Sequence, residues 1–401
     1  MIVENRRARA HMDWPLIIMV FAMAIFGVLS VCVATFAPGD NADASLLSHI
    51  VSSNYAVRQC VFLVVGVVVI TVLSNFPYDL MKRMTPMLYL GGTLLVLVVW
   101  VFNRAEGVKA WLDIIWGYTI QPSEFIKLAM ILMMARVLSR KERPCATISE
   151  TFRTLAIVGV PCVVILASGE MGSLLVIVFF SAIMMYFANV PMKTLGILAG
   201  MVVGAVLALY LFMTLTNSDS YRLARIAAFI DPELYSSTDA YQMRQSQVAI
   251  GSGGLHGIGI FVDGAMSQLN YVPADWTDFI FATIGEAFGF VGCCGVLGMY
   301  LLIFLRILYL GYHTRDRFGQ LVIYGVFGML LFHVMENIGM TMGLLPITGI
   351  PLPFLSYGGS SMTTNMGGIA LVLNVTKNRS LSGQFATPQT HTTTFRYIRR
   401  R

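Results

Sequence analysis

The sequence has little charge for its length. Only 12% of its 401 residues are Asp, Glu, Lys or Arg, whereas 57% are hydrophobic; ordinary soluble domains carry about 25% charged residues. This excludes a soluble enzyme and indicates an integral membrane protein. The formal net charge of +6 does not indicate a nucleic-acid partner, because the basic residues lie in short loops and at the two ends of the chain.

The chain also lacks a cysteine framework. Cys32, Cys60, Cys162, Cys293 and Cys294 fall in or beside apolar runs, and Cys145 falls in a basic loop. No pair lies in a predicted outer loop, so we expect neither disulfides nor a cysteine-based metal site. The sequence shows no inverted internal repeat of the kind that many transporters carry.

Apolar runs of about 17–25 residues, long enough to cross a bilayer, occur about ten times. They cover residues 14–36, 57–75, 86–102, 122–138, 153–168, 171–189, 194–216, 279–310, 319–343 and 355–376. The first run is too long for a signal peptide and lacks a small-residue cleavage site, so we expect a retained helix. The expected fold is an all-α polytopic membrane domain over 14–378, between a cytoplasmic segment, 1–13, and a disordered basic tail, 379–401.

Basic residues alternate between the loops that join these spans. On one side fall Lys82, Arg83, Arg140, Lys141, Arg143, Lys193, Arg315 and Arg317, together with the basic chain ends. Because cytoplasmic loops carry an excess of Lys and Arg, we expect an even number of spans with both termini in the cytoplasm. The long polar stretch 217–278, between the seventh and eighth spans, then lies outside.

The stretch 345–361 cannot form one helix. Its prolines, Pro346, Pro351 and Pro353, remove backbone donors. Irregular backbone at membrane depth is tolerated where it is buried in protein or lines a wet cavity. We expect this segment, which includes Ser356, to wall a substrate pocket; a tight loop between two helices is the alternative.

Ionisable residues at membrane depth cost about 2.5–3.5 kcal/mol each on insertion scales, so each needs a reason. Glu124 and Lys127 stand three residues apart on one helix face, and they can form a structural pair or line a cavity. Glu170 lies between the fifth and sixth spans. Glu286 and Glu336 lie deeper, and we expect them to tie helices together.

Asp278 ends the long polar stretch, directly before the apolar residues 279–282. Thr277 and Asp278 can simply begin a helix, with the carboxylate facing the helix dipole, and Trp276 can simply anchor the membrane interface. The alternative is a carboxylate at the membrane surface that does chemistry on a substrate which is itself half lipid. Position alone leaves both readings open.

Several long motifs resemble the SEDS family of bacterial cell-wall polymerases. They are QPSEFIK at 121–127, YQMRQSQVAIGSGGLHG at 241–257, SQLNYVPADWTDFIFATIGEAFGFVG at 267–292 and NIGMTMGLLPITGIPLPFLSYGGSS at 337–361. The resemblance runs from about Asp13 to Arg379. The opening residues Met12 to Leu16 are more similar to the elongation branch, RodA, than to the division branch, FtsW.

The resemblance implies glycosyl transfer from lipid II, building peptidoglycan at the outer face of the bacterial cytoplasmic membrane. It implies that Asp278 is the catalytic base, because the family's Pro-Glu-x-His-Thr-Asp motif matches residues 273–278. This chain departs from the motif at Ala274 and Trp276, and Glu170 stands where the family has an aspartate. These departures put the tuning of acid–base chemistry in doubt.

The resemblance and the chain's polarity together give a set of expected substrate contacts and partners. The expected contacts are Glu124, Lys127, Trp111, Lys109, Glu170, Arg222 and Ser356. Lys127, Lys109 and Arg222 are candidates to meet the leaving pyrophosphate, and a divalent cation, Mg or Mn, can assist. The expected protein partners are a class B penicillin-binding protein and the machinery of cell elongation or division.

Two other functions compete with the polymerase. A lipid II flippase would use the intramembrane charges as a translocation path, although the long outer loop and the lack of a repeat argue against it. A scaffold that only recruits or activates the penicillin-binding protein would agree with the departures at Ala274 and Trp276. Synthesis of glycan by the purified protein would distinguish all three.

Overall fold

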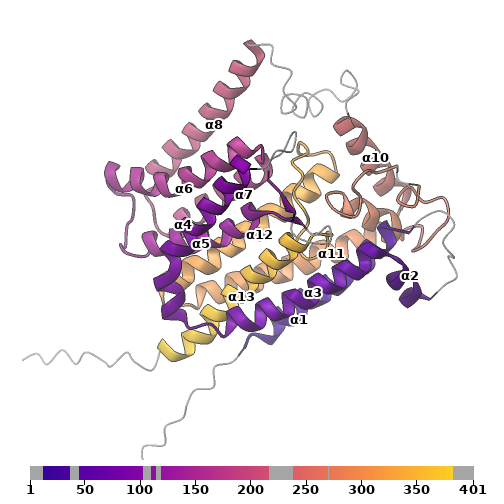
Figure 1. Ribbon diagram of the computed structural model, residues 1–401, viewed down its shortest axis with the longest axis horizontal. Helices are drawn as coiled ribbons and strands as arrows, with labels where there is room; N and C mark the ends of the chain where they lie inside the picture. The colour runs from indigo at the N-terminus through magenta and orange to yellow at the C-terminus, as the bar shows by residue number, and fades with distance from the viewer. Residues whose placement is uncertain are drawn as a thin grey trace, which may run out of the picture.

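We describe the protein from a computed structural model, over residues 12–36, 45–102, 110–113, 119–215, 238–269 and 271–382. The elements are α1 (Trp14–Ala34), α2 (Leu46–Ser52), α3 (Asn54–Ser74), α4 (Tyr78–Phe102), β1 (Leu112–Asp113), β2 (Thr119–Ile120), α5 (Pro122–Leu138), α6 (Ile148–Ser168), α7 (Met171–Phe187), α8 (Met192–Leu215), α10 (Thr238–Ser252), α11 (Ile280–Tyr312), α12 (Arg317–Thr341) and α13 (Gly359–Ser382). Most of the helices pack into one elongated bundle, and α8 extends away from it beside α7 (Figure 1). β1 and β2 form a small antiparallel hairpin.

Each of the ten predicted spans coincides with a helix: α1, α3, α4, α5, α6, α7, α8, α11, α12 and α13. Six of these helices are long and apolar enough to cross a membrane, and the 17-residue α7 is a shorter apolar helix. The chain is therefore a multi-pass membrane protein. The main differences are at helix starts: α4 begins at Tyr78, eight residues before the predicted 86, because a charged first turn continues into the apolar run.

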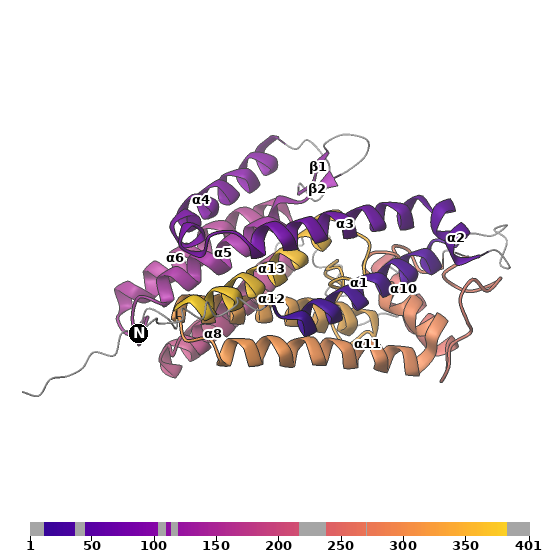
Figure 2. The same cartoon turned by 90° about the horizontal axis from the view of Figure 1, so that it is seen from below.

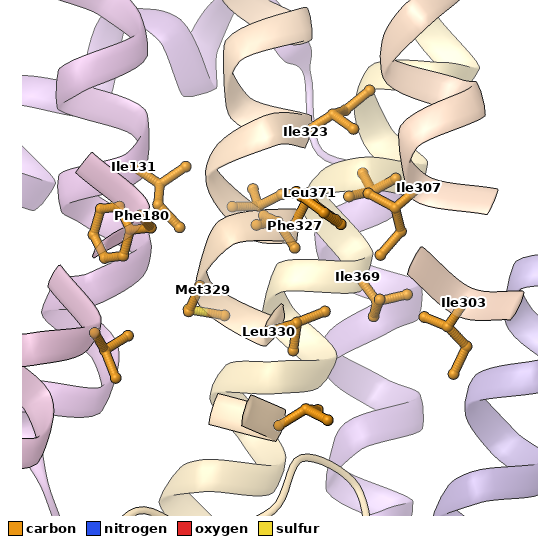
Figure 3. Packing of buried hydrophobic residues seen from close by; sticks show 14 of the residues in the cluster. Ile131, Phe180, Ile303, Ile307, Ile323, Phe327, Met329, Leu330, Ile369 and Leu371 are labelled. Carbon is orange, nitrogen blue, oxygen red and sulfur yellow. The ribbon is translucent and has the colours of Figure 1, made fainter. Parts of the chain in front are cut away.

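The centre of the bundle is α12. Of its most apolar stretch, 78% is buried, against 22% for α3 and for α4, whose outer faces are left for lipid. Figure 3 shows side chains from four other helices around α12, including Ile131 of α5, Phe180 of α7, Ile307 of α11 and Leu371 of α13. Because protein interiors are close-packed, a helix that is buried on all sides fixes the positions of the side chains that neighbouring helices pack against it.

The predicted cytoplasmic loops gather at one end of the bundle. The Arg317 guanidinium donates to the carbonyl oxygens of Glu142 and Ala188, at 2.8 and 2.7 Å. Lys82 pairs with Asp316 at 3.5 Å. These contacts join four of the basic loops, and they confirm that those loops share one side.

The described ends of the chain lie at this same end. Asp13, just before α1, pairs with Arg306 near the end of α11 at 2.7 Å. Asn374, in the last half of α13, donates to the carbonyl oxygen of Leu73 at the end of α3, at 2.8 Å. At the other end of the bundle lie α2 and α10 (Figure 2). An even number of spans produces this arrangement.

Candidate active site

Three successive carbonyl oxygens hold the backbone around Asp278 in place. The carbonyl oxygens of residues 276, 277 and 278 accept hydrogen bonds, in that order, from the Tyr357 amide at 2.9 Å, the Ser356 hydroxyl at 2.6 Å and the Asn337 side-chain amide at 2.7 Å. Two of the donors lie in the proline-rich segment and the third lies on α12. Because these donors come from two separately packed elements, the position of the Asp278 backbone is fixed.

Asp278 does not cap a helix. The following helix, α11, begins at Ile280, and Phe279 occupies the N-cap position without a side-chain cap hydrogen bond. The half-buried carboxylate of Asp278 lies beside Gly349, where an added Cβ would come within 3.4 Å of Oδ2. The structural alternative, a carboxylate in the first turn of a helix, is therefore not what the chain adopts.

Ser356 is a positioning residue. Its side chain is 4% exposed, and its hydroxyl donates to Thr277 while accepting from the Leu352 amide at 2.8 Å. A hydroxyl has one proton to donate, and in Ser356 this proton is donated to the Thr277 carbonyl oxygen. Ser356 therefore holds the loop that carries Asp278, and its predicted contact with substrate stays a prediction.

The glycine-rich run after α10 docks on α11 backbone to backbone. Ile258 donates to the Glu286 carbonyl at 2.9 Å. At Gly257, where φ is +81°, a Cβ would lie 2.2 Å from the Ala287 carbonyl oxygen. Gly289 interrupts α11 with a φ of 66°, so both partners need glycine. This close approach places the loop 253–279 against the bundle.

Glu286 fixes the same loop. Its carboxylate accepts from the backbone amides of Met266 and Ser267, at 2.6 and 3.1 Å. Glu336 accepts from the Thr348 hydroxyl at 2.8 Å and so ties α12 to the proline-rich segment. We expected both carboxylates to tie helices to one another; in the structure each ties a helix to a loop.

Asp275, which the sequence did not indicate, is fully buried in this loop, with 0% of its surface exposed. Burial raises the pKa of its carboxyl well above the ordinary value, and the nearby Glu286 carboxylate raises it further. Burial therefore favours the neutral form of the Asp275 carboxyl. Two aspartates three residues apart thus differ in environment, and only Asp278 reaches the surface.

Glu124 and Lys127 form a buried pair that also involves α12. Lys127 Nζ lies 2.6 Å from Glu124 Oε1 and 3.0 Å from His333 Nε2. His333 Nδ1 lies 2.6 Å from the Met329 carbonyl oxygen, so Nδ1 carries the proton and Nε2 accepts from the ammonium group. His333 was missed, because a lone histidine in an apolar run gives no sign of its partner.

Helix α12 links this pair to Asp278. His333 and Asn337 stand four residues apart and therefore lie on one face of the helix. His333 contacts Lys127, and Asn337 holds the Asp278 carbonyl oxygen. Two groups of residues that are far apart in the sequence are thus attached to the same rigid element. Lys127 itself is 1% exposed, so its ammonium group lies inside the protein, and its predicted contact with substrate stays a prediction.

Glu170 joins two helix starts. It occupies the N-cap position of α7, and its Oε2 accepts from Gln121 at 2.8 Å, Ser123 at 2.5 Å and Ser173 at 2.9 Å. The first two donors stand at the start of α5. Glu170 therefore fixes α5, and with it Glu124, against α7.

Of the other predicted contacts, only Trp111 falls in the described part of the chain. It precedes β1 and is 46% exposed. Lys109 and Arg222 lie outside the described residues. Within the described ranges, no three His, Cys, Asp or Glu side chains come together as a metal site. All six cysteines are free.

Known proteins with similar sequences cover nearly all of the chain. The family of FtsW, RodA and SpoVE, described as cell cycle proteins, matches residues 13–381. The peptidoglycan glycosyltransferase MrdB of Escherichia coli K12 is 28% identical over 93% of this chain and 95% of its own length. Stage V sporulation protein E of Bacillus subtilis is 32% identical over 80% of this chain and 87% of its own length.

Solved structures show the same fold. The rod shape determining protein RodA of Thermus thermophilus superposes with a TM-score of 0.66 at 25% identity, covering 94% of this chain and 99% of RodA. A chain described as part of a peptidoglycan synthase complex that coordinates polymerization and crosslinking superposes with a TM-score of 0.73 at 26% identity, covering 92% of this chain and 98% of that one. This chain belongs to the FtsW, RodA and SpoVE family of cell cycle proteins.

Proposed function

We propose that this protein is a peptidoglycan glycosyltransferase that polymerises lipid II at the outer face of the bacterial cytoplasmic membrane. The observation that carries the proposal is the fixed position of Asp278. Three hydrogen bonds to the backbone carbonyl oxygens of residues 276–278 hold it in place. The names of the relatives support the activity. The basic loops at one end of the bundle support an outward-facing site, because such loops stay in the cytoplasm.

In the proposed reaction, the 4-hydroxyl of an acceptor sugar attacks the anomeric carbon of a lipid-linked donor. A new C–O bond forms, the bond to undecaprenyl pyrophosphate breaks, and Asp278 takes the hydroxyl proton. A carboxylate in this role contributes about 10²–10⁴-fold in rate. The apolar helices hold the polyprenyl chains in the membrane while the sugars stay in water.

The leaving pyrophosphate needs cations or backbone donors. Lys127 is paired with Glu124 inside the protein, so we assign it to holding the site together. Lys109 and Arg222 stay candidates for the pyrophosphate. A cation such as Mg or Mn would need ligands from the substrate phosphates, as Mg²⁺ sites often do, because the described residues supply no group of three.

We further propose a class B penicillin-binding protein as the partner, within the machinery of cell elongation or division. Support comes from the similar chain in a complex that coordinates polymerization and crosslinking. A membrane glycosyltransferase and a transpeptidase use the same strand in succession, so an assembly of the two passes nascent glycan directly to the crosslinking site.

The experiment is reconstitution of the purified full-length protein in liposomes with fluorescent lipid II, alone and with its cognate transpeptidase. We expect glycan strands to lengthen from lipid II that is already on the outside. Movement of lipid II across the bilayer without strand growth would instead show a transporter. Strand growth in neither mixture, with the transpeptidase still bound, would show a scaffold.

A further inference from the structure

A cavity of about 390 Å³ opens beside Trp276, between the end of α1, the short helix α2 and the start of α3. It is lined by Cys32, Ala34, Thr35, Phe36, His49, Ser52, Ser53, Asn54, Tyr55 and Trp276. None of the roles described above uses it. Its volume is at the lower end of the roughly 300–1,000 Å³ of small-molecule sites, so it suits a sugar unit better than a long polyprenyl chain.

The described residues that line this cavity are polar and aromatic, and none of them is Lys, Arg, Asp or Glu. A pyrophosphate needs cationic or charge-assisted donors, so the cavity does not fit the charged part of a lipid-linked substrate. Hydroxyl, amide and imidazole groups beside aromatic rings suit a neutral ligand that has hydroxyl groups on its rim and C–H groups on its faces. A sugar ring has this chemistry.

His49 gives the cavity a polar group with an unused hydrogen-bonding capacity. Its side chain is 5% exposed, and its ring stacks on Phe261 with the ring centroids 4.0 Å apart. Its Nε2 has no hydrogen-bond partner among the residues that the structure places. A buried polar atom without a partner costs stability. At the wall of a cavity, a ligand or water can satisfy it after a small rearrangement.

Trp276 joins the cavity to the loop that carries Asp278. It lies two residues before Asp278, and its carbonyl oxygen is held by the Tyr357 amide at 2.9 Å. Its ring lies 5.2 Å from that of Tyr55, measured between centroids. A ligand against Trp276 is therefore adjacent to the segment whose position the proline-rich loop fixes.

We propose that this cavity is a subsite for a neutral N-acetylated amino-sugar ring of the glycan, next to the ring that reacts at Asp278. The inference rests on the proposed function, since it names where that substrate is held. Trp276 and Tyr55 supply the aromatic wall, and His49 supplies a hydrogen bond. The substitution of the family's histidine by Trp276 thus gives this chain a stacking surface at the same position.

The test uses N,N′-diacetylchitobiose, a neutral amino-sugar disaccharide, as the probe. Binding to the purified full-length protein is followed by saturation-transfer NMR in a detergent without a sugar head group. Ser52→Trp places a bulky side chain in the cavity, and Val51→Trp is the matched control, because Val51 is 68% exposed and does not line it. We expect Ser52→Trp to weaken binding at least about tenfold, the loss typical of an anchor contact, and Val51→Trp to bind as wild type.

Trp276→Leu is the second variant, and it should also weaken binding about tenfold while the protein stays folded. No binding of the disaccharide to wild type, or equal binding by wild type, Ser52→Trp and Trp276→Leu, would overturn the inference. Polymerisation is measured separately. Disaccharide binding that is lost in the variants supports the subsite even if wild type makes no glycan. The absence of glycan synthesis would contradict the proposed function alone.

Discussion

The hydroxyl of Ser356 donates a hydrogen bond of 2.6 Å to the carbonyl oxygen of Thr277, the residue directly before Asp278. The two residues are 79 positions apart in the sequence. The contact explains why the proline-rich segment is irregular. The chain turns at residues 353–355 and so brings both the Ser356 hydroxyl and the Tyr357 amide to the loop that carries Asp278.

Ser356→Ala should lower polymerisation more than stability would explain. The change leaves the Thr277 carbonyl without its donor, which costs about 1–3 kcal/mol for a buried group, and it lets the Asp278 loop move. Initial rates on lipid II and the melting temperature are measured together. Thr71→Val is the control, because Thr71 bonds only to its own helix on an exposed face. A rate equal to that of the control would contradict the positioning role.

Lys127→Met should destabilise the protein by about 3–5 kcal/mol, because it leaves the Glu124 carboxylate buried without its partner. The double variant Glu124→Gln/Lys127→Met should recover much of this loss. Lys141→Met, in the exposed pair with Glu150, should cost less than about 1 kcal/mol. Unfolding in detergent measures all three. Additive effects of the two buried substitutions would show that the pair is not coupled.

The stability contributed by Asp275 should depend on pH with a definite sign. Burial raises the pKa of this carboxyl in the folded protein well above its ordinary value of 3.8. The folded protein therefore holds a proton that the unfolded chain releases, and stability falls as pH rises through this window. Asp275→Asn removes the effect. Its melting temperature, relative to wild type, should be higher at about pH 7.5 than at about pH 4.5; a difference that does not change with pH would refute the raised pKa of Asp275.

Gly257→Ala should displace the loop that leads to Asp278. The added Cβ would lie 2.2 Å from the Ala287 carbonyl oxygen, at a residue with a φ of +81°. Gly251→Ala is the matched control: it lies in α10 with open space around it, and alanine there should stabilise the helix by about 0.5–1 kcal/mol. Protease sensitivity of the loop 253–279 and the rate of polymerisation are the measurements. Equal behaviour of the two variants would contradict the backbone docking.

Much of the fold could be predicted from the sequence, because each apolar run had to become a helix in a bilayer. The sides of the loops followed from Arg317, Lys82 and the other basic residues. The starts of α4 and α6 were predicted too late in the sequence, because a hydropathy pattern does not detect the part of a helix that contains charged residues. The helix α10 lay inside a stretch expected only to be an outer loop.

The site was predictable in its residue types but not in its contacts. The resemblance indicated Asp278, Glu124 and Lys127. It could not indicate His333 or Asn337, because these residues lie on α12, far in the sequence from the residues that they contact. The contact of Ser356 with Thr277 could not be predicted, because a serine in a pocket-forming segment can face either way. Asp275 gave no signal, because an aspartate near a membrane surface is ordinarily solvated.

The most direct test compares two aspartates of the same loop in one assay. Purified wild type, Asp278→Asn and Asp275→Asn are reconstituted with labelled lipid II, and the initial rate of glycan growth is measured. Loss of the base should lower the rate of Asp278→Asn by at least about 100-fold. Asp275→Asn should stay close to wild type, because an amide replaces a carboxyl that is 0% exposed and whose pKa is raised by burial. Glycan growth by Asp278→Asn at the wild-type rate would contradict the account.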